Sequence, residues 1–164
     1  MLRALTNSRL AYVLTVSHRW IGPVAVLVVA AVARLWNLGN PASIMFDETY
    51  YVKDAWTLWH QGFEANWPSG FKDSSFAAGD LFAYRKALSA EFVSHPPLGK
   101  WIIGIGEILT GGANPAGWRI SVAIIGILSV ALLMLVTHRL FENLGITVLA
   151  GSLFAIDNLS LIHI

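Results

Sequence analysis

Apolar residues fall into four long blocks, and more than half of the charged residues gather between the first two. The blocks cover residues 20–38, 98–110, 118–137 and 144–164. A helix needs roughly 20 mostly apolar residues to cross a membrane, and the first, third and last blocks meet this length. Residues 120–137 carry no charged side chain, so this block has no polar face to turn toward water. The pattern predicts an all-α polytopic membrane protein rather than a soluble helical one.

The second block, residues 98–110, is short for a span. A window of this length also suits a buried core helix or a re-entrant segment. Pro96–Pro97 gives the block a sharp start and Gly111–Gly112 a stop, as is typical of helix ends. We therefore predict a helix here and interpret it as a second span, which gives about four transmembrane helices.

The segment before the first block is basic. Its charged residues are Arg3, Arg9 and Arg19, with no acid among them. Signal peptides also begin in this way, but the apolar block is too long for one and no small-residue cleavage pattern follows it. The positive-inside rule then places residues 1–19 in the cytoplasm and the loop at 39–97 on the outer face. We expect a multi-pass protein of the plasma membrane.

Composition narrows the function classes further. Hydrophobic residues make up 55% of the chain and charged residues 13%, against about 25% charged in an average soluble domain. So few charges exclude intrinsic disorder and most nucleic-acid binding, and a net charge of +1 gives no reason to expect a polyanionic partner. The absence of cysteine excludes disulfides, thiolate zinc sites and a cysteine nucleophile. Membrane lipids are the expected surroundings.

The outer loop is too long to be a simple connection and should hold structure of its own. Residues 44–61 are predicted to be helical, with Pro41 upstream and Gly62 downstream as punctuation. Apolar side chains recur there at spacings of three and four, which makes one stripe: Tyr51, Val52, Ala55, Trp56 and Trp59. A stripe rich in tryptophan and tyrosine suits a helix that lies in the membrane interface.

The rest of the loop gives weaker signals. Residues 62–92 are rich in glycine and serine, which indicates irregular chain, yet they are too aromatic to be disordered. We expect them to pack against the membrane face or against other parts of the protein. Residues 91–94 suit a short extended stretch before the prolines. Gly104 and Gly106, inside an apolar helix, indicate close helix packing.

Asp47 and Glu48 are the candidate catalytic acids. Two simpler interpretations exist, because acids in a first helical turn favour the helix dipole and exposed acids are common in loops. The pair is predicted to lie beside the membrane, however, with Met45–Phe46 before it and Tyr50–Tyr51 after it. A carboxylate in such partly apolar surroundings can serve as a general base.

The string His95-Pro96-Pro97-Leu98-Gly99-Lys100 is the second candidate. Pro96 biases His95 toward extended backbone, so the string presents His95 and Lys100 at the outer mouth of the second block. His95 can equally be a structural hydrogen-bonding residue. Lys100 can reach up to the interface, or it can hold an anionic lipid headgroup.

These two strings together resemble the protein O-mannosyltransferases, most closely the actinobacterial type. The string MFDETYY at 45–51 is followed by HPPLGKW at 95–101, and the later GWRI at 117–120 and AIDNL at 155–159 are also similar to that family. The resemblance covers residues 20–160. A bare Asp-Glu pair would be weak, but the two motifs at this separation, each beside its own apolar block, are specific.

The resemblance implies a GT-C-type glycosyltransferase with a large helical first loop that carries an Asp-Glu motif. It implies polyprenyl-phosphate mannose as the donor and a Ser or Thr hydroxyl of an exported protein, secreted or membrane-bound, as the acceptor. It also implies transfer with inversion, in which Asp47 is the general base and Glu48 helps to position the acceptor. No residue spacing argues for a metal site, although the acidic loop leaves a divalent cation possible.

His95, Lys100 and Arg119 are the candidate cations for the phosphate of the donor. An inverting transfer from a phosphodiester needs a cation or hydrogen-bond donors at the leaving group rather than a general acid. Arg119 resembles a family arginine tied to the lipid phosphate. If residues 98–110 cross the membrane, however, Arg119 lies roughly 30 Å from Asp47, on the far side.

The resemblance also implies an incomplete chain. Family members are several times longer, with about eleven spans, and the block at 144–164 ends without a stop signal. Residues Leu159–Ile164 also look like a translated sequencing adaptor. We therefore expect the N-terminal part of a single GT-C membrane domain, inactive by itself.

Two other functions remain open from the sequence. One is a GT-C relative that uses another lipid-linked sugar or another acceptor, such as an aminoarabinose or arabinose transferase. The other is a non-catalytic polytopic protein, which should have ionisable residues lining a path through the membrane. Arg34, Glu107 and Asp157 are the residues that fit this second idea, and they are scattered along the chain.

Overall fold

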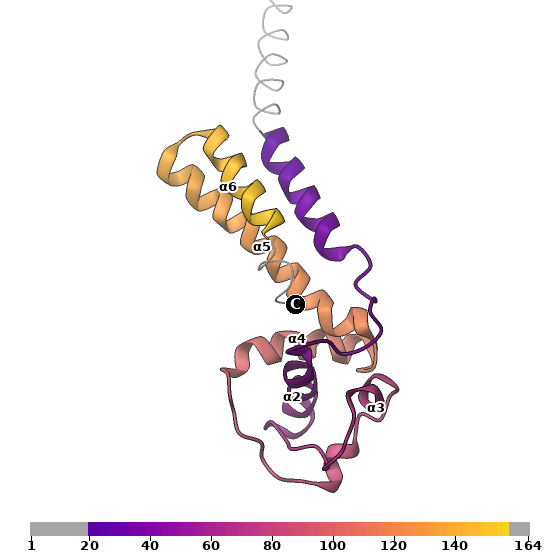
Figure 1. The fold of residues 1–164 in the computed structure, drawn as a ribbon. Helices are drawn as coiled ribbons and strands as arrows, with labels where there is room; N and C mark the ends of the chain where they lie inside the picture. Colours follow the sequence, from indigo (N-terminus) through magenta and orange to yellow (C-terminus); the bar gives the residue numbers. More distant parts are fainter. Residues whose placement is uncertain (1–19, 158–164) are drawn as a thin grey trace, which may run out of the picture. The chain divides into compact units, whose positions relative to one another are not determined.

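A computed structural model describes residues 20–157 of the chain, and this part is helical. It contains no strand, only an isolated bridge between Ala65 and Ala90. The described residues form two compact units, which we call the helical unit (20–34 with 126–157) and the loop unit (35–125). The helices are Trp20–Leu35, α2 (Glu48–Gln61), α3 (Asp73–Ala77), the 3-10 turn η1 (Ala83–Lys86), α4 (Pro97–Thr110), α5 (Pro115–Phe141) and α6 (Leu144–Ile156) (Figure 1).

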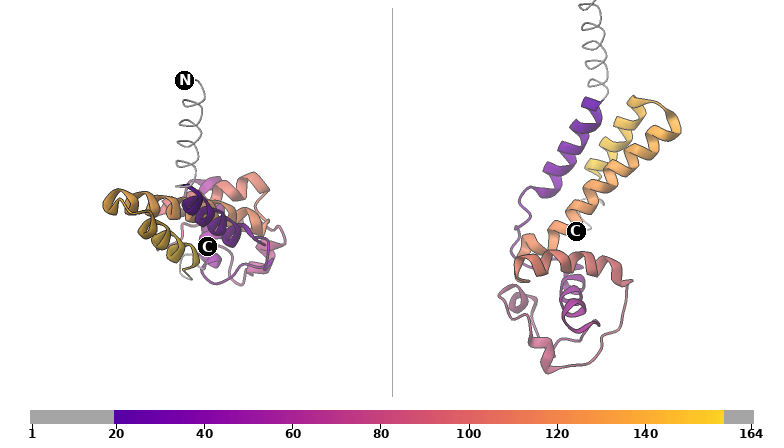
Figure 2. Two further views of the ribbon diagram at one scale, coloured as in Figure 1. Left: turned by 90° about the horizontal axis from the view of Figure 1, so that it is seen from above. Right: turned by 180° about the vertical axis from the view of Figure 1, so that it is seen from behind.

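The helical unit packs three helices side by side (Figures 1 and 2). Its buried core consists of Val26, Ala30, Val130, Met134 and Ala155. Near the end of α6, Arg34 is buried and donates a hydrogen bond to the carbonyl of Ala155 at 3.1 Å. A buried arginine thus satisfies a helix-end carbonyl that has no partner within its own helix.

Helix α5 is long and apolar enough to cross a membrane, as the third block predicts. Its 27 residues span about 40 Å at 1.5 Å per residue. The helices Trp20–Leu35 and α6 are apolar but shorter within the described residues. Their membrane crossings, and the total of about four spans, stay predictions, and the cytoplasmic lead-in at 1–19 and the suspected adaptor residues 159–164 lie outside the described part.

The loop unit is organised around α2 and α4, which pack against each other (Figure 2, right). Trp59 of α2 lies on Gly104 of α4, where a Cβ atom would come within 2.0 Å of the indole ring. The Trp59 indole N–H donates to the carbonyl of Trp101 at 3.0 Å. Two residues further along α4, the carbonyl of Gly117 would lie 2.0 Å from a Cβ on Gly106. The prediction of close packing at both glycines is confirmed.

The loop helix begins later than the sequence pattern predicts. It starts at Glu48 rather than at residue 44, because Phe46 has a positive φ of 46°, outside the helical range. In addition, the Met45 N–H donates a hydrogen bond to the Glu48 carboxylate, which closes a turn over residues 45–48. The predicted stop at Gly62 is confirmed, since Gly62 adopts the left-handed conformation that glycine favours.

The apolar stripe of α2 is buried largely inside the loop unit. Val52, Ala55 and Trp56 are buried, and the core around them also contains Ile44, Ala65, Phe76, Leu81, Tyr84 and Trp118. Two aromatic residues of the irregular 62–92 segment, Phe76 and Tyr84, therefore fill the loop's own core. Other aromatic residues of this segment are exposed, so packing against the membrane face or other parts of the protein stays a prediction.

Candidate functional site

Asp47 is the N-cap residue of α2, and its carboxylate has no hydrogen-bond or ion-pair partner within residues 20–157. The side chain is exposed and makes no capping hydrogen bond, whereas its backbone carbonyl accepts from the N–H groups of Tyr50 and Tyr51. The helix therefore fixes the backbone of Asp47 while its carboxylate faces outward. The predicted opening of the helix by Asp47 and Glu48 is confirmed.

Glu48, the next residue, is in the opposite situation. It is 7% exposed, and both carboxylate oxygens are occupied. Oε1 accepts from Arg119 Nε at 2.6 Å, and Oε2 accepts from Arg119 Nη2 and from the Met45 N–H, both at 2.9 Å. Two parallel bonds between a guanidinium and a carboxylate are among the strongest hydrogen bonds in proteins. Little of Glu48 is left for an acceptor substrate.

Arg119 lies on the first turns of α5, and the structure brings it to Glu48. The expectation that Arg119 lies a membrane thickness from the acidic pair was therefore wrong, because α4 does not carry the chain away from the loop unit. Besides Glu48, its guanidinium donates to the carbonyls of Leu38, Pro41 and Ser43 at 2.9–3.1 Å. These contacts use all five of its N–H donors. No N–H group remains for a lipid phosphate.

The ammonium group of Lys100 is also already paired with carboxylates of the protein. It is 2% exposed, and its ammonium group contacts the carboxylates of Asp54 at 2.9 Å and Glu64 at 2.5 Å. Both partners are buried as well. A buried charge needs such partners, because the loss of hydration is otherwise not compensated. The geometry shows a structural ion cluster rather than an open phosphate site.

Glu91 completes this cluster. Its carboxyl group hydrogen-bonds Asp54, and its N–H donates to the backbone carbonyl of Glu64. Burial raises the pKa of Asp54, the charge of Glu64 adds to this shift, and Lys100 opposes it. Burial also raises the pKa of Glu91, and the charge of Asp54 adds to that shift. Lys100 contacts two of these three carboxyl groups, and three neighbouring carboxylates cannot all ionise cheaply, so protonation of one of them is favoured.

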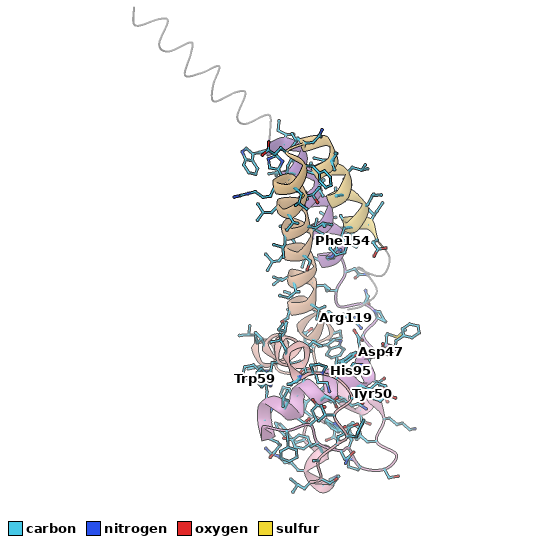
Figure 3. The ribbon with its side chains drawn as sticks, turned by 90° about the vertical axis from the view of Figure 1, so that its left-hand side faces the viewer. Asp47, Tyr50, Trp59, His95, Arg119 and Phe154 are labelled. Carbon is cyan, nitrogen blue, oxygen red and sulfur yellow. The ribbon has the colours of Figure 1, made fainter. Side chains whose placement is uncertain are left out.

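His95 is the sequence-predicted cation that the protein leaves accessible. It is exposed and precedes the N-cap of α4. Its ring meets the ring of Tyr51 edge to face, with centroids 5.3 Å apart. Tyr51 follows Asp47 by one turn of α2, which places His95 on the side of the helix that carries the free carboxylate (Figure 3).

The structure shows a second set of contacts near Asp47, around Asp73, that the sequence did not predict. Thr49 Oγ1 donates to Asp73 Oδ2 at 2.7 Å, and Lys53 contacts Asp73 Oδ1 at 2.8 Å. Burial alone would raise the pKa of Asp73, but the hydrogen bonds from Lys53 and Thr49 outweigh it and lower that pKa. The spacing of Thr49 and Lys53 puts them on one helix face, yet nothing in the pattern identifies the distant Asp73 as their partner.

The described residues contain no group of three His, Cys, Asp or Glu side chains that would hold a metal ion. Most of the acids near α2 already have protein partners, as shown above. A divalent cation stays an expectation that rests on the acidic composition of the loop.

Apolar helices, one of them long enough to cross a membrane, combined with a folded loop that carries the polar residues are typical of an α-helical membrane protein. Residues 24–163 match the family model described as dolichyl-phosphate-mannose-protein mannosyltransferase. The chain belongs to this family of glycosyltransferases, as its sequence motifs predicted.

Curated relatives agree with this assignment. The chain is 31% identical over 147 residues to the polyprenol-phosphate-mannose–protein mannosyltransferases of Mycolicibacterium smegmatis and Mycobacterium tuberculosis, with 87% of this chain covered. It is also 31% identical over 140 residues to the Corynebacterium glutamicum protein of the same name, with 84% covered. The chain spans about a quarter of the length of each relative. No solved structure matches it significantly.

Proposed function

We propose that this chain supplies the catalytic loop of an inverting mannosyltransferase. The donor is polyprenyl-phosphate mannose and the acceptor is a Ser or Thr hydroxyl of an exported protein. One observation carries the proposal: Asp47 presents an exposed carboxylate with no partner in the described part of the chain. The neighbouring acids are all engaged by cations, namely Glu48, Asp54, Glu64 and Asp73. A general base must be free to accept a proton, and Asp47 meets that condition.

Asp47 takes the proton of the acceptor hydroxyl in this reaction. The hydroxyl oxygen then forms a bond to C1 of mannose, while the bond from C1 to the phosphate oxygen breaks. The electron pair of that bond leaves with polyprenyl phosphate, and the configuration at C1 inverts. The departing phosphate carries its own negative charge, so it needs hydrogen-bond donors or cations rather than a proton.

His95 is our choice for the phosphate contact within this chain. It is exposed and lies next to Tyr51, on the Asp47 side of α2. Lys100 and Arg119, the two other candidates, already satisfy buried carboxylates. We assign Glu48 and Arg119 to holding the segment before α2 in place, which orients Asp47.

The contact between Arg119 and Glu48, together with the short length of α4, supports a revised membrane topology. Helix α4 has 14 residues and spans about 21 Å, less than the roughly 30 Å hydrocarbon core. We propose that α4 belongs to the extracytoplasmic loop and that α5 is the second span. Arg119 then starts that span on the outer face, beside Glu48. Arg139, at the other end of α5, falls on the cytoplasmic side, in agreement with the positive-inside rule.

The test is mannosyl transfer by a protein of the relatives' full length that contains this chain. Membranes receive radiolabelled polyprenyl-phosphate mannose and a Ser/Thr-rich peptide, and Asp47→Asn is compared with Asp80→Asn, a change at another exposed acid of the loop unit. We expect Asp47→Asn to lower kcat by about 10²–10⁴-fold and Asp80→Asn to leave it unchanged.

Other outcomes separate the competing functions. No labelled peptide from well-inserted wild-type protein contradicts the donor or the acceptor, and lipid-linked arabinose or aminoarabinose would then replace mannose in the assay. Equal labelling by wild type and Asp47→Asn retains the enzyme but removes Asp47 from the role of base. Failure with every lipid-linked sugar favours a non-catalytic membrane protein.

A further inference from the structure

We propose that Lys100 is a positioning residue, which holds His95 beside Asp47 by fixing the start of α4 to the middle of α2. This inference rests on the proposed function for its kinetic consequences, but not for its geometry. It differs from the expectation that Lys100 binds the donor phosphate. Lys100 acts here through the buried carboxylates of Asp54 and Glu64, without touching the substrate.

The helical period places the partners on one face of α2. Asp54 follows Asp47 by seven residues, which is close to two full turns, and Tyr51 follows Asp47 by about one turn. Asp54 contacts Lys100 at 2.9 Å, and Tyr51 contacts the ring of His95. One face of α2 therefore carries the free carboxylate and both points at which the start of α4 meets the helix.

The chain between the two α4 residues transmits this constraint. Pro96, the N-cap of α4, and Pro97, its first residue, directly follow His95, and each proline ring fixes its own φ angle. Pro96 also restricts the backbone of His95 itself to extended conformations. Because these residues have little freedom, the position of Lys100 determines the position of His95 closely.

The buried surroundings make Lys100 hard to replace in this role. Its ammonium group joins Asp54 on α2 and Glu64 on the segment after α2, and all three side chains are at most 8% exposed. Without Lys100, two buried carboxylates would face each other with no counter-charge and would move apart or take up protons. The carbonyl of the next residue, Trp101, accepts from the Trp59 indole N–H, and Gly104 one turn further along packs on the same indole. The rest of α4 therefore stays attached to α2, and loss of Lys100 should release mainly the His95 end.

A cross-linking experiment tests the geometry without reference to activity. The chain has no cysteine, so Tyr51→Cys with His95→Cys introduces a defined pair for a short bifunctional thiol reagent. In the full-length protein we expect Lys100→Met to slow this cross-link about tenfold, because the fraction of molecules with residue 95 beside residue 51 should fall by about that factor. A control pair, Thr49→Cys with Asp73→Cys, should cross-link at an unchanged rate, which shows that the loop unit remains folded.

Rescue distinguishes positioning from phosphate binding. Combining Lys100→Met with Asp54→Leu and Glu64→Leu replaces the ion cluster by apolar side chains, which buried clusters often tolerate. We expect the triple variant to restore both the Tyr51–His95 cross-link and most of the kcat lost in Lys100→Met. We also expect Lys100→Met to have little further effect on kcat once His95→Ala is present.

The opposite results overturn the proposal. If Lys100→Met leaves the cross-link at the wild-type rate, Lys100 does not position His95. If it raises the KM for polyprenyl-phosphate mannose and the triple variant fails to recover activity, Lys100 binds the donor. Slowing of both cysteine pairs shows a general loss of folding and also contradicts a local role. If wild type transfers no mannose but the cross-links behave as expected, the proposed function fails while the positioning role stands.

Discussion

The Arg119 guanidinium meets the Glu48 carboxylate through two parallel hydrogen bonds, 2.6 Å from Nε to Oε1 and 2.9 Å from Nη2 to Oε2. Its other donors go to backbone carbonyls of residues 38–43. Arg119 thus gathers the chain that leads into α2 around a single planar group. Asp47 lies between residues 38–43 and the first turn of α2, so the direction of its side chain depends on the Arg119–Glu48 pair.

We predict that Arg119→Lys fails to replace arginine, although it keeps the charge. A lysine cannot reproduce the two parallel bonds or reach all three carbonyls. Removing one partner of a buried ion pair typically costs about 3–5 kcal/mol, and Arg119→Lys should lose a large part of this. Hydrogen exchange of residues 38–48 measures the change, with Arg85→Lys as control because Arg85 is exposed. If residues 38–48 of Arg119→Lys kept the wild-type protection from exchange, the parallel bonds between Arg119 and Glu48 would not be what holds this segment.

The sequence predicted the helical segments well because their signals are local. Apolar blocks, the prolines at 96–97 and the glycines at 62 and 111–112 each act on their own stretch of backbone. The helix at 44–61 began four residues late, because Glu48 bonds back to Met45 instead of continuing a helix through Phe46. The residue at which the helix begins therefore depends on Arg119, which lies 71 positions away and binds the same Glu48 carboxylate.

The sequence nominates residues for the candidate site, whose roles stay predictions, but it does not indicate the contacts that they make with one another. Motif spacing identified Asp47, His95 and Lys100 without showing which charges neutralise one another. Lys100 pairs with Glu64, 36 positions earlier, because the turn after α2 folds back across α4. A cation near an acidic loop can bind a substrate anion or a protein carboxylate, and only the tertiary contacts decide between these two possibilities.

Packing at Gly104 gives a second prediction. A Cβ atom there would lie 2.0 Å from Trp59 Cδ1, whereas a Cβ on Gly99 of the same helix would meet nothing within 4 Å. Gly104→Ala should therefore push α4 away from α2 and cost about 1–3 kcal/mol. Gly99→Ala should be neutral or slightly stabilising, since alanine favours helix over glycine. Thermal unfolding of the detergent-solubilised protein compares the two, and equal midpoints would show that the α2–α4 contact is looser than described.

The hydrogen bond from Thr49 to Asp73 gives a third prediction. Thr49→Val keeps the shape of the side chain but removes the donor, leaving one oxygen of a partly buried carboxylate without its partner. The expected loss is about 0.5–1.5 kcal/mol, and Thr49→Ser should retain most of the stability because it keeps the hydroxyl. Thermal midpoints at pH 7 measure both variants. A Thr49→Ser protein as unstable as Thr49→Val would mean that the methyl group, not the hydroxyl, matters.

The carboxyl cluster around Lys100 predicts how stability depends on pH. Burial, together with the charge of Asp54, raises the pKa of Glu91 above its usual 4.5. The folded protein therefore keeps this proton at pH values where the unfolded chain has lost it. Glu91 thus favours folding below about pH 4.5, and this contribution is lost as the pH rises through the raised pKa.

The substitution Glu91→Gln tests this pH dependence, because glutamine stays neutral throughout and can still donate a hydrogen bond to Asp54. Glu91→Gln should match wild type near pH 4 and be more stable at pH 7.5, by less than about 1 kcal/mol because solvent screens a partly exposed group. Thermal unfolding at the two pH values checks this, with Asp80→Asn as a control for loss of one exposed charge. A Glu91→Gln protein that is less stable than wild type at pH 7.5 would show that ionised Glu91 is held by Lys53 or Lys100 instead of opposed by Asp54 and Glu64.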